Sequence, residues 1–344
     1  MKNRPALTWN TGSRNMSAVI KRVLLLCLLV FFTAGCSASD QGTAKEEKVP
    51  DAGHKLKVVA TIFPQYDFVR EIAGDKVDLK MLLKPGEESH SYEPTPKDII
   101  DIQNCDLFIY VGGENDAWVE DILDSMDSGK RKDLRLVDCV DTVAEEHVEG
   151  MKEDRHEEEP ELKEEEFDEH VWTSPKNAVK IVEKITELLC QEDPGNEKAY
   201  RQSAEAYEEK LEILDGQFEK VVKESPRNTV LFGDRFPFRY FVDEYGLKYY
   251  AAFPGCASDT EPSAATMAFL INKVKEEKIP VVLKMELSNE NVAKAIAEAT
   301  GAKVKVFYSC HNLTADQFQE YATYLSLMEK NVATLKEALS DGID

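Results

Sequence analysis

Two histidines, His90 and His170, stand in local sequences suited to holding a metal ion. His90 lies in EESHSYEP (residues 87–94) and His170 lies in DEHVW (residues 168–172), and each precedes a predicted helix. Imidazole is the commonest protein ligand for zinc and similar ions. Because the two histidines are far apart in the sequence, the fold must bring them together, and a local zinc finger is not expected.

The net charge favours cations as partners. The chain of 344 residues has 42 basic and 65 acidic residues, which gives a formal net charge of −23 at pH 7. Nucleic acids and anionic membrane surfaces repel such a protein, so we expect neither as a direct partner. At this length, with 42% apolar residues, the chain can bury one large core or two medium ones.

The N-terminal region has the features of an export signal. A basic pair precedes an apolar run, residues 23–32, which is too short to span a bilayer but suits the core of a signal peptide. The run ends at TAGC (residues 33–36), which resembles the lipobox of bacterial lipoproteins, although a threonine replaces the usual leucine. We expect residues 1–36 to be a signal peptide with Cys36 as the lipidated residue, and residues 37–54 to be a flexible tether. The alternative is a plain secretory cleavage site.

The apolar pattern of residues 55–195 predicts an α/β lobe. Strands are predicted at residues 55–61, 77–83 and 107–111, and helices begin near Pro64, Pro96 and Pro175. The continuous apolar run of the third strand is typical of a strand buried on both faces of a parallel sheet. The alternation of strands and helices implies right-handed crossovers.

A long helix and a second α/β lobe follow. Residues 196–225 carry apolar side chains spaced alternately by four and three, which predicts one helix roughly 40 Å long. Strands are then predicted at 229–232, 248–252, 280–283 and 303–307, and helices near 237–245, 262–277, 289–300 and 315–339. The expected fold is therefore α/β, with two Rossmann-like lobes, residues 55–195 and 226–344, each around a central sheet and joined by the one long helix.

Residues 145–169 interrupt this pattern. They form a run of Glu, Asp and Lys that holds His147 and His156. Such a segment buries too little apolar surface to order itself, so we expect a mobile acidic loop within the first lobe. The loop is either a solvated spacer or a weak collector of cations.

Segments distributed along the chain resemble the metal-binding solute-binding proteins of ABC importers, the TroA-like zinc and manganese family. In order they are VVATIFPQYDFVR (58–70), IAGDK (72–76), HSYEPTPK (90–97), DLFIYVG (106–112), HVWTSP (170–175), YGL (245–247) with EPS (261–263), and YLSLM (324–328). The resemblance covers nearly all of the mature chain. It implies two lobes joined by one helix, with the metal in the cleft between the lobes and held by two residues from each.

The same resemblance suggests the ligands. His90 and His170 match the first two. The third position falls on Arg235, which stays protonated and has no lone pair to offer a cation. We expect Asp234, one residue earlier, to replace it as a ligand; the alternative is a carboxylate paired with Arg235 or Arg239.

The fourth position falls in residues 308–312, directly after a predicted strand. Strand C-termini are where open α/β sheets place ligands. His311 is the expected ligand, and Cys310 is its competitor. A disulfide between Cys310 and Cys256, whose loop should reach the same cleft, would remove Cys310 from the ligand set.

These features predict a lipid-anchored receptor on the outer face of the cell membrane. It would capture a divalent transition metal and hand it to an ABC permease and its ATPase. Imidazole and carboxylate ligands favour zinc, with manganese or iron as the alternative, whereas calcium and magnesium prefer all-oxygen shells. We expect a monomer that is not an enzyme.

A secreted zinc hydrolase and an adhesin are the two alternative functions. A secreted zinc hydrolase would need an open coordination position and a general base, a role that Glu88 could fill. The sequence contains no HExxH and no nucleophile elbow. An adhesin is the second rival, and nothing in the sequence supports a separate adhesive surface.

Overall fold

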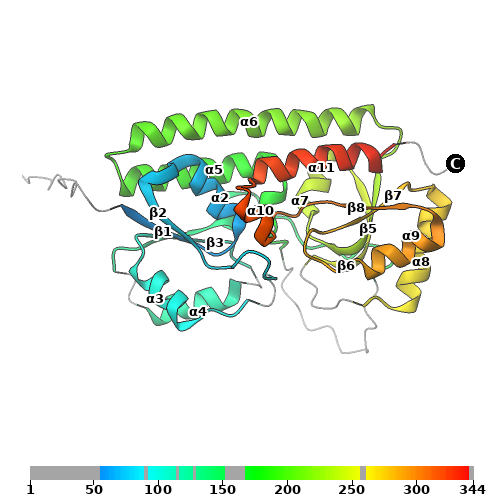
Figure 1. Cartoon of the computed structure of the whole chain (residues 1–344), viewed down its shortest axis with the longest axis horizontal. Helices are drawn as coiled ribbons and strands as arrows, with labels where there is room; N and C mark the ends of the chain where they lie inside the picture. Colours follow the sequence, from blue (N-terminus) through cyan, green and yellow to red (C-terminus); the bar gives the residue numbers. More distant parts are fainter. Residues whose placement is uncertain are drawn as a thin grey trace, which may run out of the picture. The chain divides into compact units, whose positions relative to one another are not determined.

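The computed structural model describes residues 55–88, 92–113, 116–126, 129–151, 167–255 and 261–340. This part of the chain folds into two parallel four-stranded sheets with flanking helices (Figure 1). The prediction of two α/β lobes with one long helix between them is confirmed. Within the described ranges, no helix has both the length and the apolar character needed to cross a membrane.

The N-terminal lobe is built on a sheet with the strand order β2-β1-β3-β4. Its strands are β1 (Leu56–Ala60), β2 (Val77–Met81), β3 (Leu107–Tyr110) and β4 (Lys132–Arg135), and its helices are α2 (Phe63–Ala73), α3 (Pro96–Asn104) and α4 (Ala117–Ser125). Every residue of β3 is buried, as its apolar run predicts. Thr95 caps α3 by accepting a hydrogen bond from the backbone N–H of Asp98.

The C-terminal lobe repeats this topology with the strand order β6-β5-β7-β8. Its strands are β5 (Thr229–Phe236), β6 (Lys248–Pro254), β7 (Val281–Lys284) and β8 (Lys303–Val306), and its helices are α7 (Arg239–Tyr245), α8 (Ala264–Glu277) and α9 (Asn291–Thr300). The strand order reverses between β1 and β3, and again between β5 and β7. Open α/β sheets bind ligands beyond the strand C-termini at such reversals.

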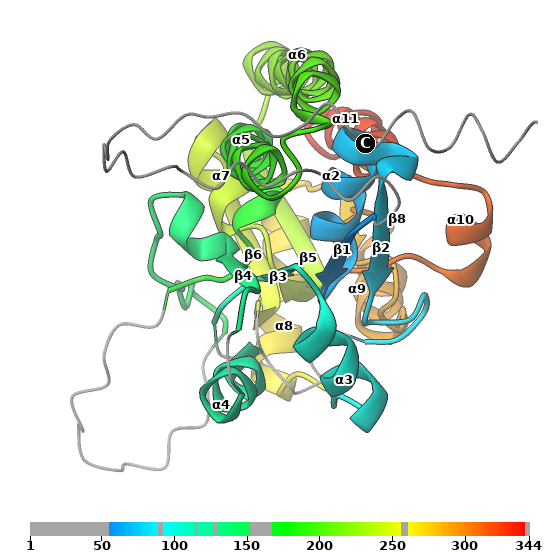
Figure 2. The same cartoon turned by 90° about the vertical axis from the view of Figure 1, so that its left-hand side faces the viewer.

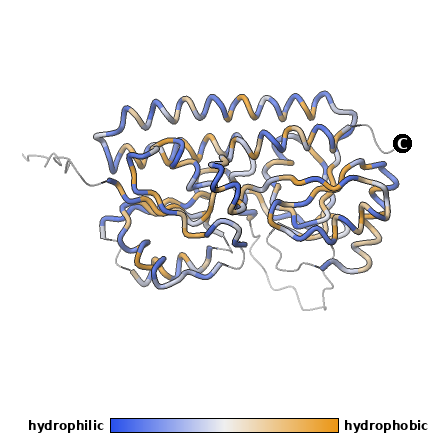
Figure 3. Tube along the Cα trace, viewed as in Figure 1, coloured by the Kyte–Doolittle hydropathy of each residue, from blue (hydrophilic) through white to orange (hydrophobic). Residues whose placement is uncertain are grey.

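Helix α6 (Glu197–Glu224) runs along both lobes and packs on α2, α5 (Pro175–Glu192) and α11 (Tyr324–Ala338) (Figure 1). Its buried residues fall on the predicted apolar stripe: Tyr200, Ala204, Tyr207, Leu211, Leu214 and Phe218. Figure 2 shows α5, α6 and α11 on one side of the sheets and α3 and α4 on the other. In Figure 3 the strands are largely hydrophobic, whereas α6 alternates between hydrophobic and hydrophilic residues.

One hydrophobic core runs through both lobes. A single cluster of buried side chains includes Val58 and Ile109 of the first sheet, Val230 and Leu283 of the second, and Phe218 of α6. Protein interiors are close-packed and resist sliding of their parts. The two lobes are therefore held together along α6.

Two elements of the N-terminal lobe were not predicted from the sequence. Strand β4 has no apolar run, because its residues KDLR are exposed or half-buried at the edge of the sheet. Helix α4 buries only Val119 fully. Both contribute little to the core, so the apolar periodicity that would predict them is weak.

The single helix predicted at residues 315–339 is wrong, because the structure has two, α10 (Ala315–Gln319) and α11. Tyr321 between them has a φ of 55°, a left-handed conformation that a continuous helix cannot contain. Thr323 then caps α11 by accepting a hydrogen bond from the backbone N–H of Ser326.

The mobile loop predicted over residues 145–169 is wrong at its ends. Met151, Asp168 and Glu169 are buried, and Ala144 forms an isolated bridge with Phe167. The ends of the acidic stretch therefore belong to the packed lobe. The central part of the prediction, including His156, lies outside the described residues.

Candidate metal site

The structure brings His170 of the N-terminal lobe close to His311 of the C-terminal lobe. His170 directly precedes a short 3-10 turn (Val171–Thr173), and His311 follows β8. Their ring centroids are 4.7 Å apart, with an angle of 76° between the ring planes. Trp172 packs edge-on against His311 at 4.9 Å. Two imidazoles from opposite lobes at this separation can belong to one metal site.

The ring of His170 is completely buried and held by a carboxylate. Its Nδ1 lies 2.8 Å from Oδ1 of Asp168, which also accepts the backbone N–H of His170. A carboxylate can only accept here, so Nδ1 carries the proton and Nε2 keeps the lone pair that a metal needs. Burial acts to lower the pKa of His170, but the charge and hydrogen bond of Asp168 outweigh it and the pKa is raised.

Residues of the C-terminal lobe fix this arrangement. Tyr240 on α7 donates its hydroxyl hydrogen to the backbone oxygen of Asp168 at 2.6 Å. Gly255, directly after β6, lies against the imidazole, and a Cβ added there would stand 3.0 Å from Cε1 of His170. A larger residue at Gly255 would therefore push the ring out of position.

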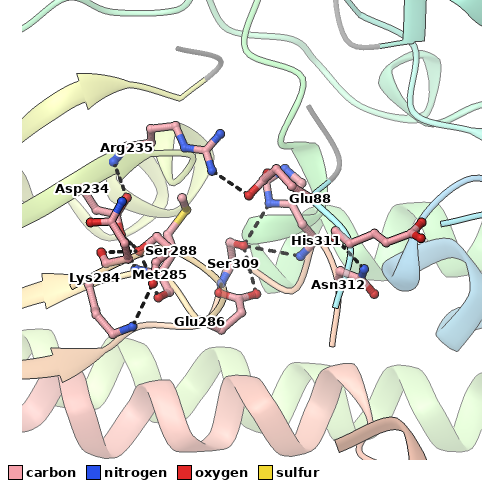
Figure 4. Close-up of polar contacts among 12 residues, drawn as sticks. Glu88, Asp234, Arg235, Lys284, Met285, Glu286, Ser288, Ser309, His311 and Asn312 are labelled. Atoms are coloured by element: carbon pink, nitrogen blue, oxygen red, sulfur yellow. Dashed lines mark hydrogen bonds and ion pairs between the residues drawn. The ribbon is translucent and has the colours of Figure 1, made fainter. Parts of the chain in front are cut away.

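His311 is held by a relay of two residues. Its Nδ1 lies 2.9 Å from Oγ of Ser309, and that hydroxyl donates to Oε1 of Glu286 at 3.0 Å (Figure 4). A hydroxyl has one hydrogen; since Ser309 gives it to the carboxylate, it accepts from Nδ1 of His311. Nε2 of His311 is then the lone-pair nitrogen, as in His170.

Glu286 was missed in the reasoning from sequence. It also accepts the backbone N–H groups of Ser309 and Cys310, each at 2.8 Å. Burial raises the pKa of Glu286 to about 7, against the lowering effect of these hydrogen bonds. Its place shortly after β7, beyond a strand C-terminus, is the signal that could have found it.

Trp172 ties the two halves of the site together. Its indole Nε1 donates to the backbone oxygen of Ser309 at 2.9 Å, and Tyr324 donates its hydroxyl to the backbone oxygen of Trp172 at 2.7 Å. The residue two positions after His170 is thus bonded across the lobes to the residue two positions before His311. This contact fixes the separation of the two imidazoles.

The carboxylate of Asp234 is held by three hydrogen bonds within the C-terminal lobe. Asp234 sits where the register of β5 against β6 shifts, and its carboxylate accepts the backbone N–H groups of Arg235 (2.9 Å) and Met285 (2.8 Å) and the hydroxyl of Ser288 (Figure 4). One of the cavities lined by His311 is lined by Arg235 but not by Asp234. The assignment of Asp234 as a ligand stays a prediction.

Arg235 makes a contact between the lobes. Its Nη2 lies 2.9 Å from Oε2 of Glu88, on the turn that follows β2 (Figure 4). Beside it, the buried Asn312 donates its amide hydrogens to the backbone oxygens of Lys84 (2.7 Å) and Glu87 (2.8 Å). The position suggested for a third ligand is therefore occupied by an interlobe ion pair.

Cys310 does not fit either role that the sequence suggested. It is a free cysteine, completely buried in the shared core, with a φ of 61°. Cys310 is therefore not part of a disulfide in this structure, and its proposed partner Cys256 lies outside the described residues. Burial raises the pKa of the Cys310 thiol well above its usual value, which disfavours the thiolate that a metal requires.

We expect peptide mapping of the non-reduced protein to find Cys310 as a free thiol. It should resist alkylation in the native protein and react after denaturation, because burial protects it. A peptide linked through Cys256 and Cys310 in the same digest would contradict the structure. Cys139, which is partly exposed, is the control for reagent access.

Three predicted residues, Cys36, His90 and Cys256, lie outside the described residues. Among the residues that are described, no group of three or more His, Cys, Asp or Glu side chains is arranged to hold a metal. The described half of the site consists of His170 and His311, each with its supporting carboxylate.

In comparisons with known proteins, the chain matches zinc-uptake and zinc-binding proteins. A family model described as ZnuA, zinc-uptake complex component A periplasmic, matches residues 58–338. The zinc-binding lipoprotein AdcA of Streptococcus pneumoniae is 32% identical over 316 residues, which cover 92% of this chain and 60% of AdcA. The high-affinity zinc uptake system protein ZnuA of Bacillus subtilis is 32% identical over 320 residues, which cover 92% of this chain and 96% of that protein. The chain thus spans less than two thirds of AdcA.

Solved structures of zinc-binding proteins also match the chain. The crystal structure of the Zn(II)-bound ZnuA-like domain of S. pneumoniae AdcA matches with a TM-score of 0.69 at 31% identity, over 84% of this chain and 100% of that chain. The periplasmic zinc-binding protein TroA of Treponema pallidum matches with a TM-score of 0.69 at 23% identity, over 84% of this chain and 100% of that chain. At that identity the second match shows the fold alone.

Proposed function

The chain belongs to the family of periplasmic zinc-uptake complex components, and on this premise we propose that it is an extracytoplasmic receptor that binds zinc and delivers it to an ABC permease. The observation that carries the proposal is the pair His170 and His311, one from each lobe. Each ring has its Nδ1 hydrogen bonded toward a carboxylate, so each Nε2 is left as a metal-binding nitrogen.

The ligand chemistry favours zinc. Two imidazoles, with His90 as the proposed third, make a nitrogen-rich site, which suits zinc better than manganese. We propose His90, His170 and His311 as ligands, with Asp234 as the fourth. A manganese or iron receptor of the same family is the alternative.

The remaining parts of the proposal follow from the sequence and the relatives. We propose that Cys36 carries the lipid anchor, because S. pneumoniae AdcA is a zinc-binding lipoprotein. The partners would be a cognate permease and its ATPase, and the receptor would act as a monomer. A role as a hydrolase is not proposed, since the family takes part in zinc uptake.

Titration of the purified, metal-stripped protein tests the proposal. Zinc, manganese and iron would be added separately, with binding followed by competition against a chromophoric chelator. We expect zinc to bind one site per chain at least about 100-fold more tightly than manganese, in the order expected for nitrogen ligands. Equal affinity for manganese and zinc would favour the alternative receptor, and no binding of any of the three would reject the proposal.

Zinc affinity should fall as the pH falls. The raised pKa of His170 means that its ring takes up a proton at a higher pH than an ordinary histidine, and a protonated Nε2 cannot bind zinc. We expect the apparent affinity to drop at least about tenfold between about pH 7.5 and about pH 5.5, measured by chelator competition. A constant affinity over this range would contradict imidazole ligation.

A further inference from the structure

The C-terminal lobe holds the turn at residues 84–88 of the N-terminal lobe by several contacts. Arg235 pairs with Glu88 at 2.9 Å, and Asn312 donates to two backbone oxygens of the turn. The backbone N–H of Gly86 also donates to the oxygen of Leu313 at 2.7 Å. We call Glu88, Arg235 and Asn312 the interlobe clasp.

Much of the clasp, Asn312 and Arg235, is shielded from solvent. Asn312 is 1% exposed, and the side chain of Arg235 is 11% exposed against 39% for Glu88. Ion pairs on open surfaces contribute little, because water and salt screen them. A partly buried pair is screened less, so this contact should hold the turn more firmly than an exposed pair would.

The clasp also forms part of the site. One of the cavities lined by His311 is lined as well by Glu88, Arg235 and Glu286. Figure 4 shows the side chains of these residues around His311. The turn at residues 84–88 is therefore one wall of the cavity next to His311. Along the sequence, the same turn leads directly to His90.

We propose that Arg235 and Glu88 are positioning residues that set how fast the metal leaves the site. The inference rests on the proposed function. A guanidinium has no lone pair and cannot ligate a cation. Arg235 acts instead through Glu88, by keeping the wall of the cavity closed against the C-terminal lobe. Breaking the ion pair removes the side-chain contact that holds Glu88 and leaves the turn to its backbone contacts with Asn312 and Leu313, while His170 and His311 keep their own supports.

The test is the rate at which zinc-loaded protein releases zinc to excess chelator in a stopped-flow experiment. Glu88→Gln and Arg235→Gln are each expected to raise the release rate about tenfold, equivalent to ~1.4 kcal/mol. The double variant should release zinc no faster than either single variant, because both remove the same interaction. Exchanging the charges, with Glu88→Arg and Arg235→Glu together, should restore the rate to within about threefold of the native protein.

A matched control removes a different ion pair. Lys294 pairs with Glu290 at 2.7 Å on the exposed surface of α9, so Lys294→Gln should leave the release rate unchanged. Thermal unfolding of each metal-free variant separates a loss of folding from a change in release. The charge-exchange variant restores the ion pair although neither native residue is in its place. A near-native release rate in that variant would therefore show that the ion pair, and not the shape of either side chain, controls the rate.

Three results would overturn the inference. The single variants could release zinc at the native rate, or their effects could add in the double variant. Arg235→Gln could instead bind zinc more tightly, which would make Glu88 a ligand that Arg235 restrains. Failure of the native protein to bind zinc at all would reject the proposed function first, and so is distinguishable from these.

Discussion

His170→Ala is expected to weaken zinc binding by at least about 100-fold, or ~2.8 kcal/mol. The substitution removes one metal-binding nitrogen and leaves Asp168 buried without the ring that it orients. Competition against a chelator of known affinity measures the loss directly.

His147→Ala is the matched control for this variant. His147 is an exposed histidine of the acidic stretch, so its loss should change zinc affinity less than about threefold. A second variant, Asp168→Asn, keeps the imidazole but weakens its orientation, and should lower affinity by about 10-fold to 100-fold. The His170 assignment would be wrong if His147→Ala and His170→Ala lowered affinity equally.

Phe218→Ala is expected to destabilise the whole protein by about 3–5 kcal/mol. Phe218 is completely buried on α6 and packs edge-on against Phe241 of α7, with ring centroids 4.9 Å apart. Because one core runs through both lobes, the loss should lower the stability of the two lobes together. Urea unfolding should show a single transition at a lower midpoint.

Two probes check this cooperativity. Trp118 lies on α4 of the N-terminal lobe and Trp172 lies where that lobe contacts Ser309 and His311, so tryptophan fluorescence reports on the N-terminal lobe and on this contact, whereas circular dichroism reports on the whole chain. The two midpoints should coincide in Phe218→Ala. Ile213→Ala on the same helix is the control, since Ile213 is 57% exposed and should cost less than about 0.5 kcal/mol. Separate transitions for the two probes would mean that the lobes fold independently.

The sequence predicts the elements that bury apolar surface. The stripe of α6 and the buried run of β3 follow directly from residue periodicity. Strand β4 was missed because its residues stay at an exposed edge. The break at Tyr321 was missed because helical spacing of apolar residues continues across it, although the backbone does not.

The site was predicted less completely than the fold. His170 and His311 meet as the resemblance suggested, but their supports do not follow from local sequence. Glu286 reaches His311 only through Ser309, and the two residues become neighbours when β7 pairs with β8. At Asp234, the shift of register in β5 directs the carboxylate to Met285 and Ser288, which no spacing in the sequence indicates.

A permease would have to distinguish the loaded receptor from the empty one by local changes. The core that joins the lobes along α6 cannot be opened without exposing side chains such as Val230 and Phe218, which are buried in it. We therefore do not expect a large closure of the lobes to tell the permease that zinc is bound. We expect small-angle scattering to show the same radius of gyration with and without zinc, and recognition to depend on the ordering of surface residues around the cleft.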